Sequence, residues 1–398
     1  MKARRPNLSS VPPDATPEPL PRGCVDPAST TPLLDAARVV AAIAARHAAA
    51  SDVRRRLHPE VVEALVEAGF AAHFAPTRWA GRAGAFRELT AAVAVVGEGC
   101  ASAAWTASLW AYTARFAAHL PAEGQAEIWE KGPDTCVVSA LAPTGDVRAV
   151  PGGWQVSGRW PYTSGVDFSD WALVRGPGVP GGDPGRFFAL PRDAYDIQDT
   201  WHNVGMRATG SNTLVVEDVF VPEQRSFLVA DMVSGRGSDS QARCHHVPLL
   251  AVNGLTFAAP VLGSARGALV SSARWLADKQ DVHGRPVGRS PAVQAAVARA
   301  AGEIDIAEML LDRIAAGVDD DAAVTGAHVA RNGRDAALAV ELSVAAVDRL
   351  FRSGGTRAQS DSHPLQRAWR DVHAAGSHVA LQFDSGAGAF VDHLLSAV

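Results

Sequence analysis

Few side chains in this 398-residue sequence have types and spacing that suit chemistry. The segment Tyr162-Thr163-Ser164-Gly165 places two neighbouring hydroxyl groups in a glycine-ended turn, where they can bind a ligand or simply hold the turn. His378 lies in the last helical segment, and an imidazole can exchange protons near neutral pH, although it can also be a satisfied core side chain. No Asp or Glu occurs between Asp371 and Asp384, so this segment lacks a carboxylate base.

Several signatures of cofactor and catalytic sites are absent. No GxGxxG follows a strand and opens a helix, and there is no Walker loop, GxSxG elbow or HExxH. Cys244-His245-His246 has no second ligand pair at a recognisable spacing, so we expect a loop or pocket role and no metal site. The glycines from residue 176 to 185 alternate with prolines, which suits a hairpin loop. A redox cofactor would therefore need a scaffold other than a dinucleotide-binding fold.

The pattern of apolar residues predicts the elements that must position these side chains. Helical spacing occurs in the first third, from Thr31-Pro32 onward, at about 59–69, 86–97 and 102–119. Short runs rich in Val, Trp and Phe predict strands at 136–141, 154–160, 171–175, 186–190 and 214–221. Four long helices are then expected at 255–279, 291–316, 327–352 and 364–395, as in an antiparallel bundle. We therefore predict a helical domain (30–135), a small β domain (136–235) and a four-helix bundle (236–398).

Composition narrows the class of protein. The formal net charge is -5 and like charges do not cluster, which argues against a nucleic-acid partner. No apolar run approaches the roughly 20 residues of a membrane span, so no membrane association is expected. The four cysteines form no CxxC pair, which favours the cytoplasm. Residues 1–29 are rich in Pro, Ser and Asp and predict a disordered tail, or an arm that docks on a neighbouring subunit.

Four stretches, in this order along the chain, carry a resemblance to a known family. Over nearly all of residues 31–395 the sequence resembles the acyl-CoA dehydrogenase superfamily. It is most similar there to the flavin-dependent hydroxylases of the 4-hydroxyphenylacetate, 3-hydroxy-secosteroid and dibenzothiophene type. The resemblance implies an α+β fold that is mostly α, with an N-terminal helical domain, a small middle β-barrel or sandwich, and a C-terminal four-helix bundle. The stretches are Cys100–Trp105, Gly153–Gly165, Trp201–Pro222 and His363–Asp371.

The resemblance also implies a cofactor and partners. Members of this branch are oxygenase components that take reduced FMN or FAD from a separate NAD(P)H-dependent flavin reductase, by diffusion of free flavin, and react it with O2. A flavin C4a-hydroperoxide then hydroxylates an aromatic or polycyclic small molecule. The flavin lies between the β domain and the bundle, its phosphate end reaching a neighbouring subunit of a homotetramer.

Site residues follow from the same resemblance. The turn from Tyr162 to Gly165 should bind the isoalloxazine ring, with Thr163 facing flavin N5, or Ser164 if the register slips by one. A hydroxyl there can protect the hydroperoxide. His378 stands where the related hydroxylases carry a histidine and is the expected acid–base group, whereas His373 faces another direction. Lesser flavin or phosphate contacts are expected from Arg207, Ser211 and Gln294.

The sequence departs from the superfamily at its catalytic base. Main-branch dehydrogenases carry a glutamate some eight residues after the pair that is Arg370-Asp371 here, and this chain has none. Because the proton α to a thioester is weakly acidic, dehydrogenation should be abolished. Some branches place the base on an earlier helix, which leaves an acyl-CoA dehydrogenase with a displaced base as an alternative.

A second departure concerns the substrate. Related phenol hydroxylases carry another histidine on the long helix of the first domain, and that position is Thr113 here. Threonine is a poor base, so either the substrate is not a simple phenol or another group activates it; Tyr112 and His119 lack the matching spacing. An N- or S-oxygenating enzyme of the same fold therefore remains an alternative, as does a binding or scaffold protein without flavin affinity. The side chains expected to line the substrate pocket, or to be plain core, are Trp105, Ser108, Trp110 and Phe257.

Overall fold

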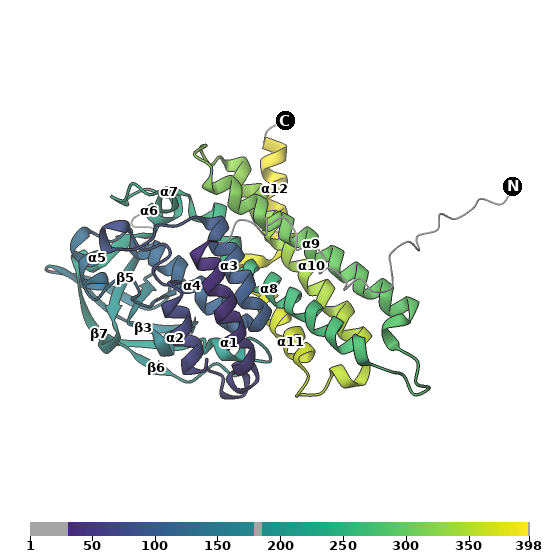
Figure 1. Ribbon diagram of the computed structural model, residues 1–398. Coiled ribbons are helices and arrows are strands. Elements are labelled where there is room, and N and C mark those ends of the chain that lie inside the picture. Colours follow the sequence, from purple (N-terminus) through teal and green to yellow (C-terminus); the bar gives the residue numbers. More distant parts are fainter. Residues whose placement is uncertain (1–30, 179–184, 397–398) are drawn as a thin grey trace.

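Five helices form the first third of the chain in the computed structural model, which describes residues 31–178 and 185–396 (Figure 1). Thr31 begins the first helix, since its hydroxyl accepts a hydrogen bond from the Leu34 amide and Pro32 follows at the first helical position. The predicted tail at 1–29 and most of the glycine-rich loop lie outside the described residues. The helices are α1 (Pro32–Arg54), α2 (Pro59–Glu67), α3 (Phe86–Gly99), α4 (Ala101–Ala117) and α5 (Ala122–Trp129).

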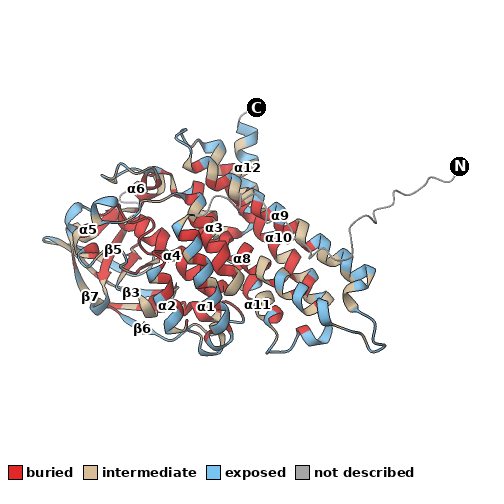
Figure 2. Ribbon diagram, viewed as in Figure 1, coloured by how far each residue is buried: buried red, intermediate tan, exposed pale blue. Residues whose placement is uncertain are grey.

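Helix α4 is the core helix of this part. Every residue of α4 except Leu109 is buried, as expected for a helix that is apolar on all sides. Figure 2 shows the buried residues concentrated where α3, α4 and the later helix α8 (Leu249–Asp278) lie together. Leu109 is half-buried, and the reason is the cavity described below.

Two four-stranded sheets form the middle of the chain. One has the order β1 (Val137–Ala140), β4 (Trp171–Arg175), β5 (Arg186–Pro191), β8 (Ser226–Leu228), and the other β2 (Asp146–Val150), β3 (Gly153–Thr163), β7 (Asn212–Pro222), β6 (Asp196–Gln198). Only β1 and β4 pair in parallel; the other pairs in the described residues are antiparallel. The rings of Trp154 and Phe188 meet across the sheets at 5.7 Å, which makes a sandwich. All five predicted strands are present, and the three additional ones are short.

The C-terminal part contains the short helices α6 (Val229–Ser234) and α7 (Arg243–His246) and then the bundle of α8, α9 (Pro291–Asp319), α10 (Gly326–Ala358), α11 (Pro364–Gly376) and α12 (Phe383–Ser396). Helix α8 is apolar and long enough to span a membrane, contrary to the expectation that no such run exists. Its most apolar 18-residue window is 78% buried inside the protein. Burial in the core accounts for its composition.

The prediction of one continuous helix over 364–395 is wrong. Helix α11 ends at Gly376, His378 has an extended backbone, and a single 3-10 turn over Val379–Leu381 precedes α12. The side-chain amide of Gln382 donates to the backbone oxygens of Gly376 and His378, both at 3.2 Å, so carbonyls left free by the break are satisfied. This break releases His378 from the helix and lets it approach α8.

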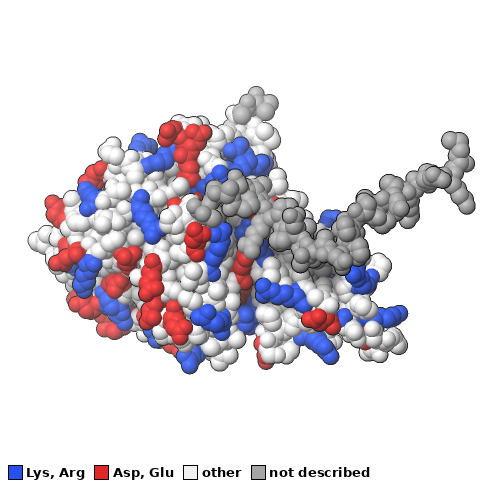
Figure 3. Space-filling model, viewed as in Figure 1, with Lys and Arg blue, Asp and Glu red and all other residues white. Residues whose placement is uncertain are grey.

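Charges of both signs are interspersed over the part of the surface formed by the N-terminal helices and the strands (Figure 3). Such a surface offers no single-sign field there for a polyanionic partner.

Candidate active site

A cavity of about 660 Å³ lies where α4, the end of β3, the 201–211 loop, α8 and the α11–α12 break meet. Its size falls within the range of small-molecule and cofactor sites, roughly 300–1,000 Å³. Its walls carry aromatic rings from Trp105, Trp201 and Phe257. Its polar lining is mainly hydroxyl groups together with one imidazole, contributed by Ser139, Tyr162, Ser164, Thr209, Ser211, Ser377 and His378.

The turn after β3 presents Ser164 to this cavity. The pairing of β3 with β7 is irregular between Trp160 and Thr163, and Tyr162 has a positive φ of 63°, so the strand twists as it ends. Gly165 follows with a φ of 72°, a conformation that favours glycine. A Cβ at Gly165 would lie 3.2 Å from the Thr106 methyl group, so close packing against α4 also favours glycine.

Thr163 does not line the cavity. Its side chain is fully buried and its hydroxyl donates to the Trp160 backbone oxygen at 3.1 Å. Of the two hydroxyl groups that the sequence left open, Ser164 is therefore the one that lines the cavity. The irregular pairing at the end of β3 turns Thr163 inward, which favours Ser164 as the hydroxyl that would face flavin N5.

Ser164 is one member of a chain of hydrogen bonds. The Trp105 indole N–H donates to Ser164 Oγ at 3.1 Å, and Ser164 Oγ lies 2.7 Å from Ser211 Oγ. Ser211 Oγ lies 2.7 Å from Thr209 Oγ1, which donates to the Met206 backbone oxygen at 2.8 Å. The chain thus joins α4, the turn after β3 and the 201–211 loop along one wall of the cavity.

His378 lines the same cavity, packed on aromatic rings. Its imidazole stacks on Phe257 with ring centroids 4.0 Å apart and meets Trp105 edge-on at 5.7 Å. Its Nδ1 accepts a hydrogen bond from the Ala380 amide at 3.2 Å. Burial lowers the pKa of His378 to about 4, because the charged form loses hydration in this apolar environment. By contrast, His373 is exposed and pairs with Asp348 at 3.0 Å, outside the cavity.

The residues expected from α4 divide into cavity and core. Trp105 lines the cavity, and so does Leu109, which the sequence did not indicate. Thr113, also expected there, is instead fully buried one turn beyond Leu109, with its hydroxyl 3.1 Å from Ser139 Oγ. Ser108 and Trp110 were expected in the pocket but belong to the core, because they point to other faces of the helix. Ser108 donates to the Thr256 backbone oxygen at 2.7 Å, and Trp110 is fully buried behind the Gly165 turn.

The alternative candidates for the missing phenol-contacting histidine lie elsewhere. Tyr112 packs against Phe74 with ring centroids 5.3 Å apart, and His119 Nδ1 bonds the Arg236 backbone oxygen at 3.0 Å. Neither lines the cavity. At this part of the cavity wall the polar group is Ser139 on β1, whose hydroxyl contacts that of Thr113. Sequence reasoning missed Ser139 because a single serine in a short strand gives no signal.

Arg207 and Gln294, expected as lesser flavin contacts, do not line the cavity of this chain, whereas Ser211 does. Arg207 instead donates to the Asp52 backbone oxygen at 3.1 Å, and this holds its side chain on α1. Gln294 is exposed on α9, beside a second and more open hollow between α9 and α10.

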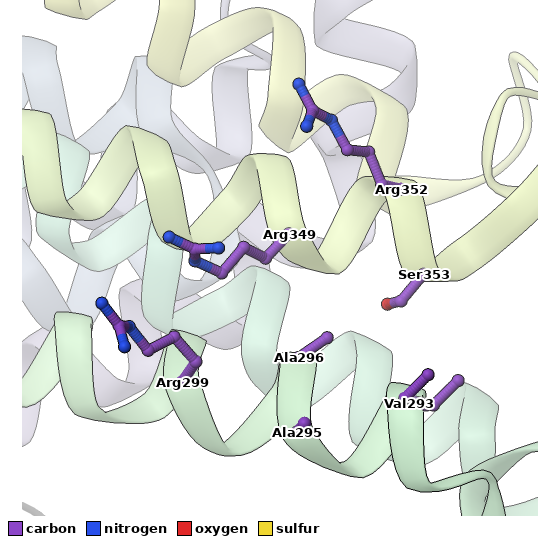
Figure 4. Close-up of a pocket in the computed structure, with 8 residues that line it drawn as sticks. Val293, Ala295, Ala296, Arg299, Arg349, Arg352 and Ser353 are labelled. Carbon is purple, nitrogen blue, oxygen red and sulfur yellow. The ribbon is translucent and has the colours of Figure 1, made fainter.

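Figure 4 shows this second hollow, which is lined mainly by alanine and arginine. Arg299 from α9 and Arg349 from α10 extend toward the same end of it, and both donate to the buried carboxylate of Glu303. It has about 740 Å³ of space but neither an aromatic wall nor an acid–base group among its lining residues. It is therefore a weaker candidate for the site of chemistry.

None of the described residues that line the cavity is Asp or Glu. Asp384, the first acidic residue after the expected position of the base, is exposed on α12.

The nearby Asp371 faces the 201–211 loop, where its carboxylate accepts a 2.6 Å hydrogen bond from the Met206 amide. Burial raises the pKa of Asp371 to about 6. Its neighbour Arg370 pairs with Asp52 at 2.8 Å. The Arg-Asp pair thus fixes the loop instead of supplying a base.

Replacing Asp371 with alanine is expected to destabilise the protein. The buried Met206 amide would lose its acceptor, which costs about 1–3 kcal/mol. Asp371→Asn keeps an acceptor oxygen and should lose less. Urea unfolding of the two variants at pH 7 measures the difference, and equal stability of wild type and Asp371→Ala would contradict this role.

Known proteins are similar to this chain in sequence and in fold. Residues 255–383 match the family model described as acyl-CoA dehydrogenase, C-terminal domain. The flavin-dependent monooxygenase oxygenase subunit HsaA of Mycobacterium tuberculosis is 35% identical over 351 residues, or 84% of this chain and 87% of the relative. The oxygenase component of an FADH(2)-dependent resorcinol hydroxylase from a Rhizobium species is 31% identical, over 83% of this chain and 86% of its own. The crystal structure of 3-HSA hydroxylase from Rhodococcus sp. RHA1 superimposes with a TM-score of 0.86 at 28% identity, covering 92% of this chain and 97% of that one.

Proposed function

Because this chain belongs to the oxygenase components of two-component flavin-dependent monooxygenases, enzymes with the acyl-CoA dehydrogenase fold, we propose that its cavity binds reduced FMN or FAD together with a small aromatic substrate. The observation that carries the proposal is the composition of the cavity wall. It combines a turn hydroxyl (Ser164), flat aromatic surfaces and one imidazole (His378), and its described lining has no carboxylate base.

The residues present fit a flavin ring. A planar ring system can pack on the indole and phenyl surfaces of the cavity, and the turn at Ser164 can hydrogen-bond its polar edge. When bound, reduced flavin would activate O2 and transfer one oxygen atom to the substrate. The chain itself would orient both molecules, exclude water with Trp105 and Phe257, and supply hydrogen bonds at Ser164 and His378.

His378 would act as a neutral hydrogen-bond donor. Its Nδ1 accepts from the Ala380 amide, so in the neutral imidazole the ring proton is on Nε2. With a pKa of about 4, the ring is uncharged at neutral pH. This differs from the expected acid–base role, since a neutral N–H stabilises developing negative charge without giving up its proton.

A second candidate reaction, oxygenation of nitrogen or sulfur, is favoured by the Thr113–Ser139 pair. The Ser139 hydroxyl, which lines the cavity and is held by Thr113, can hydrogen-bond a substrate but cannot remove a phenol proton at neutral pH. A substrate that is electron-rich without losing a proton would fit such a wall. An acyl-CoA dehydrogenase reaction fits it poorly, since the described lining has no carboxylate.

We further propose that the protein is a homotetramer in the cytoplasm. A separate NAD(P)H-dependent flavin reductase would supply its reduced flavin by diffusion of free flavin. Names of relatives that specify an oxygenase subunit or component support the reductase. Exposed apolar side chains on α9, at Ile306 and Met309, support a subunit contact on the bundle. The described cysteines are free and buried, as in a reduced compartment.

Anaerobic titration with oxidised and reduced FMN and FAD tests the proposal. We expect the reduced form of at least one flavin to bind. After mixing with O2, oxidised-flavin absorbance should return more slowly than for free flavin, and a substrate ring should gain oxygen. Lack of affinity for any flavin would favour a binding or scaffold protein. Bleaching of bound oxidised FAD by an acyl-CoA would favour a dehydrogenase.

A further inference from the structure

The hydrogen-bond chain along the cavity wall has a fixed direction. It contains four bonds, and four protons are available to fill them: the Trp105 indole N–H and one proton each on Ser164, Ser211 and Thr209. An indole N–H can only donate and a backbone carbonyl can only accept, so both ends of the chain are fixed. All four bonds form together in one arrangement only, in which each hydroxyl donates toward the Met206 oxygen.

This direction decides what Ser164 can offer to a ligand. Its proton is used by Ser211, and one of its two oxygen lone pairs is used by Trp105. The remaining lone pair can accept a hydrogen bond from a ligand in the cavity that Ser164 lines. Ser211 and Thr209 are 4% and 2% exposed, so water offers little compensation if the chain is reversed.

On the basis of the proposed function, we propose that Ser211 and Thr209 are positioning residues that make Ser164 a hydrogen-bond acceptor, and that this acceptor selects reduced over oxidised flavin. Reduced flavin carries a proton on N5 and can donate to Ser164. Oxidised flavin has only a lone pair on N5, which would meet the lone pair of Ser164. The chain therefore gives the protein a physical basis for taking up the reduced cofactor and releasing the oxidised one.

The ratio of the dissociation constants for oxidised and reduced FMN, each measured anaerobically, tests this inference. In Ser211→Ala the Ser164 proton loses its acceptor and can turn toward the cavity, so the ratio should fall roughly five- to tenfold, about the net value of one hydrogen bond. Thr209→Val should lower the ratio in the same way, because Ser211 is then free to donate back to Ser164. Thr209→Ser keeps the chain and should restore the wild-type ratio.

Thr163→Val is the matched control, since its hydroxyl lies one residue from Ser164 but outside the chain. A general packing defect weakens both redox forms and leaves the ratio unchanged. A ratio within twofold of wild type in both Ser211→Ala and Thr209→Val would overturn the inference. So would tighter binding of oxidised than of reduced FMN by the wild type. If the wild-type protein binds neither FMN nor FAD in either form, the proposed function itself fails.

Discussion

In Ser164→Ala, reduced flavin bound to the protein should react with O2 to release mainly H2O2, with little oxygen reaching the substrate. The variant removes the cavity-lining hydroxyl proposed to accept from flavin N5, so a flavin N5–H would be buried without that acceptor. An unsatisfied buried donor costs about 1–3 kcal/mol, and we therefore expect oxidised-flavin absorbance to return roughly tenfold faster after O2 mixing. Stopped-flow absorbance and the H2O2 released per reduced flavin measure the effect.

Thr163→Val separates this role from a disturbed turn. Thr163 is the neighbouring hydroxyl, and its bond to the Trp160 backbone oxygen is buried. We expect a modest loss of stability in Thr163→Val but wild-type H2O2 yield. If Thr163→Val releases as much H2O2 as Ser164→Ala, the assignment of Ser164 as the cofactor-facing hydroxyl is wrong.

Thr163 and Ser164 illustrate which parts of the structure could be predicted from the sequence and which could not. The order of helices, strands and bundle followed from apolar periodicity, and five strands were found where β-branched and aromatic residues cluster. The choice between Thr163 and Ser164 depended on one irregular pairing at the end of β3, which no local pattern encodes. A shift of one residue in a strand moves a side chain to the opposite face.

The surroundings of His378 were unpredictable for a related reason. Residues 364–395 have helical periodicity almost throughout, so the break after Gly376 gave no clear signal. The break is stabilised by the side chain of Gln382 and by packing on Phe257, which is distant in sequence. Similarly, Thr113 was expected beside the substrate, but only the fold shows that it is buried and that Ser139, whose hydroxyl lies 3.1 Å from that of Thr113, lines the cavity instead.

His378→Phe is expected to lower product formation about a hundredfold, since removal of one preorganised hydrogen-bond donor costs roughly 10²–10³ in rate. Phenylalanine preserves the stacking on Phe257 but has no Nε2–H. His378→Asn keeps an N–H donor and should retain more of the activity. The affinity for reduced flavin should stay within about twofold of wild type in both variants, because the hydrogen bonds to the flavin would come from the Ser164 turn.

The pH dependence tests the charge state of the same ring. Because the pKa of His378 is lowered to about 4, the imidazole gains its proton only below about pH 4 and stays neutral from pH 6 to 9. The ratio of wild-type to His378→Phe product yield should therefore be constant over that range. An acid–base role at an ordinary histidine pKa would instead bend this ratio near pH 6.5. If the wild-type yield bends near pH 6.5 and the His378→Phe yield does not, the ring titrates during turnover. Proton transfer would then replace the neutral-donor role.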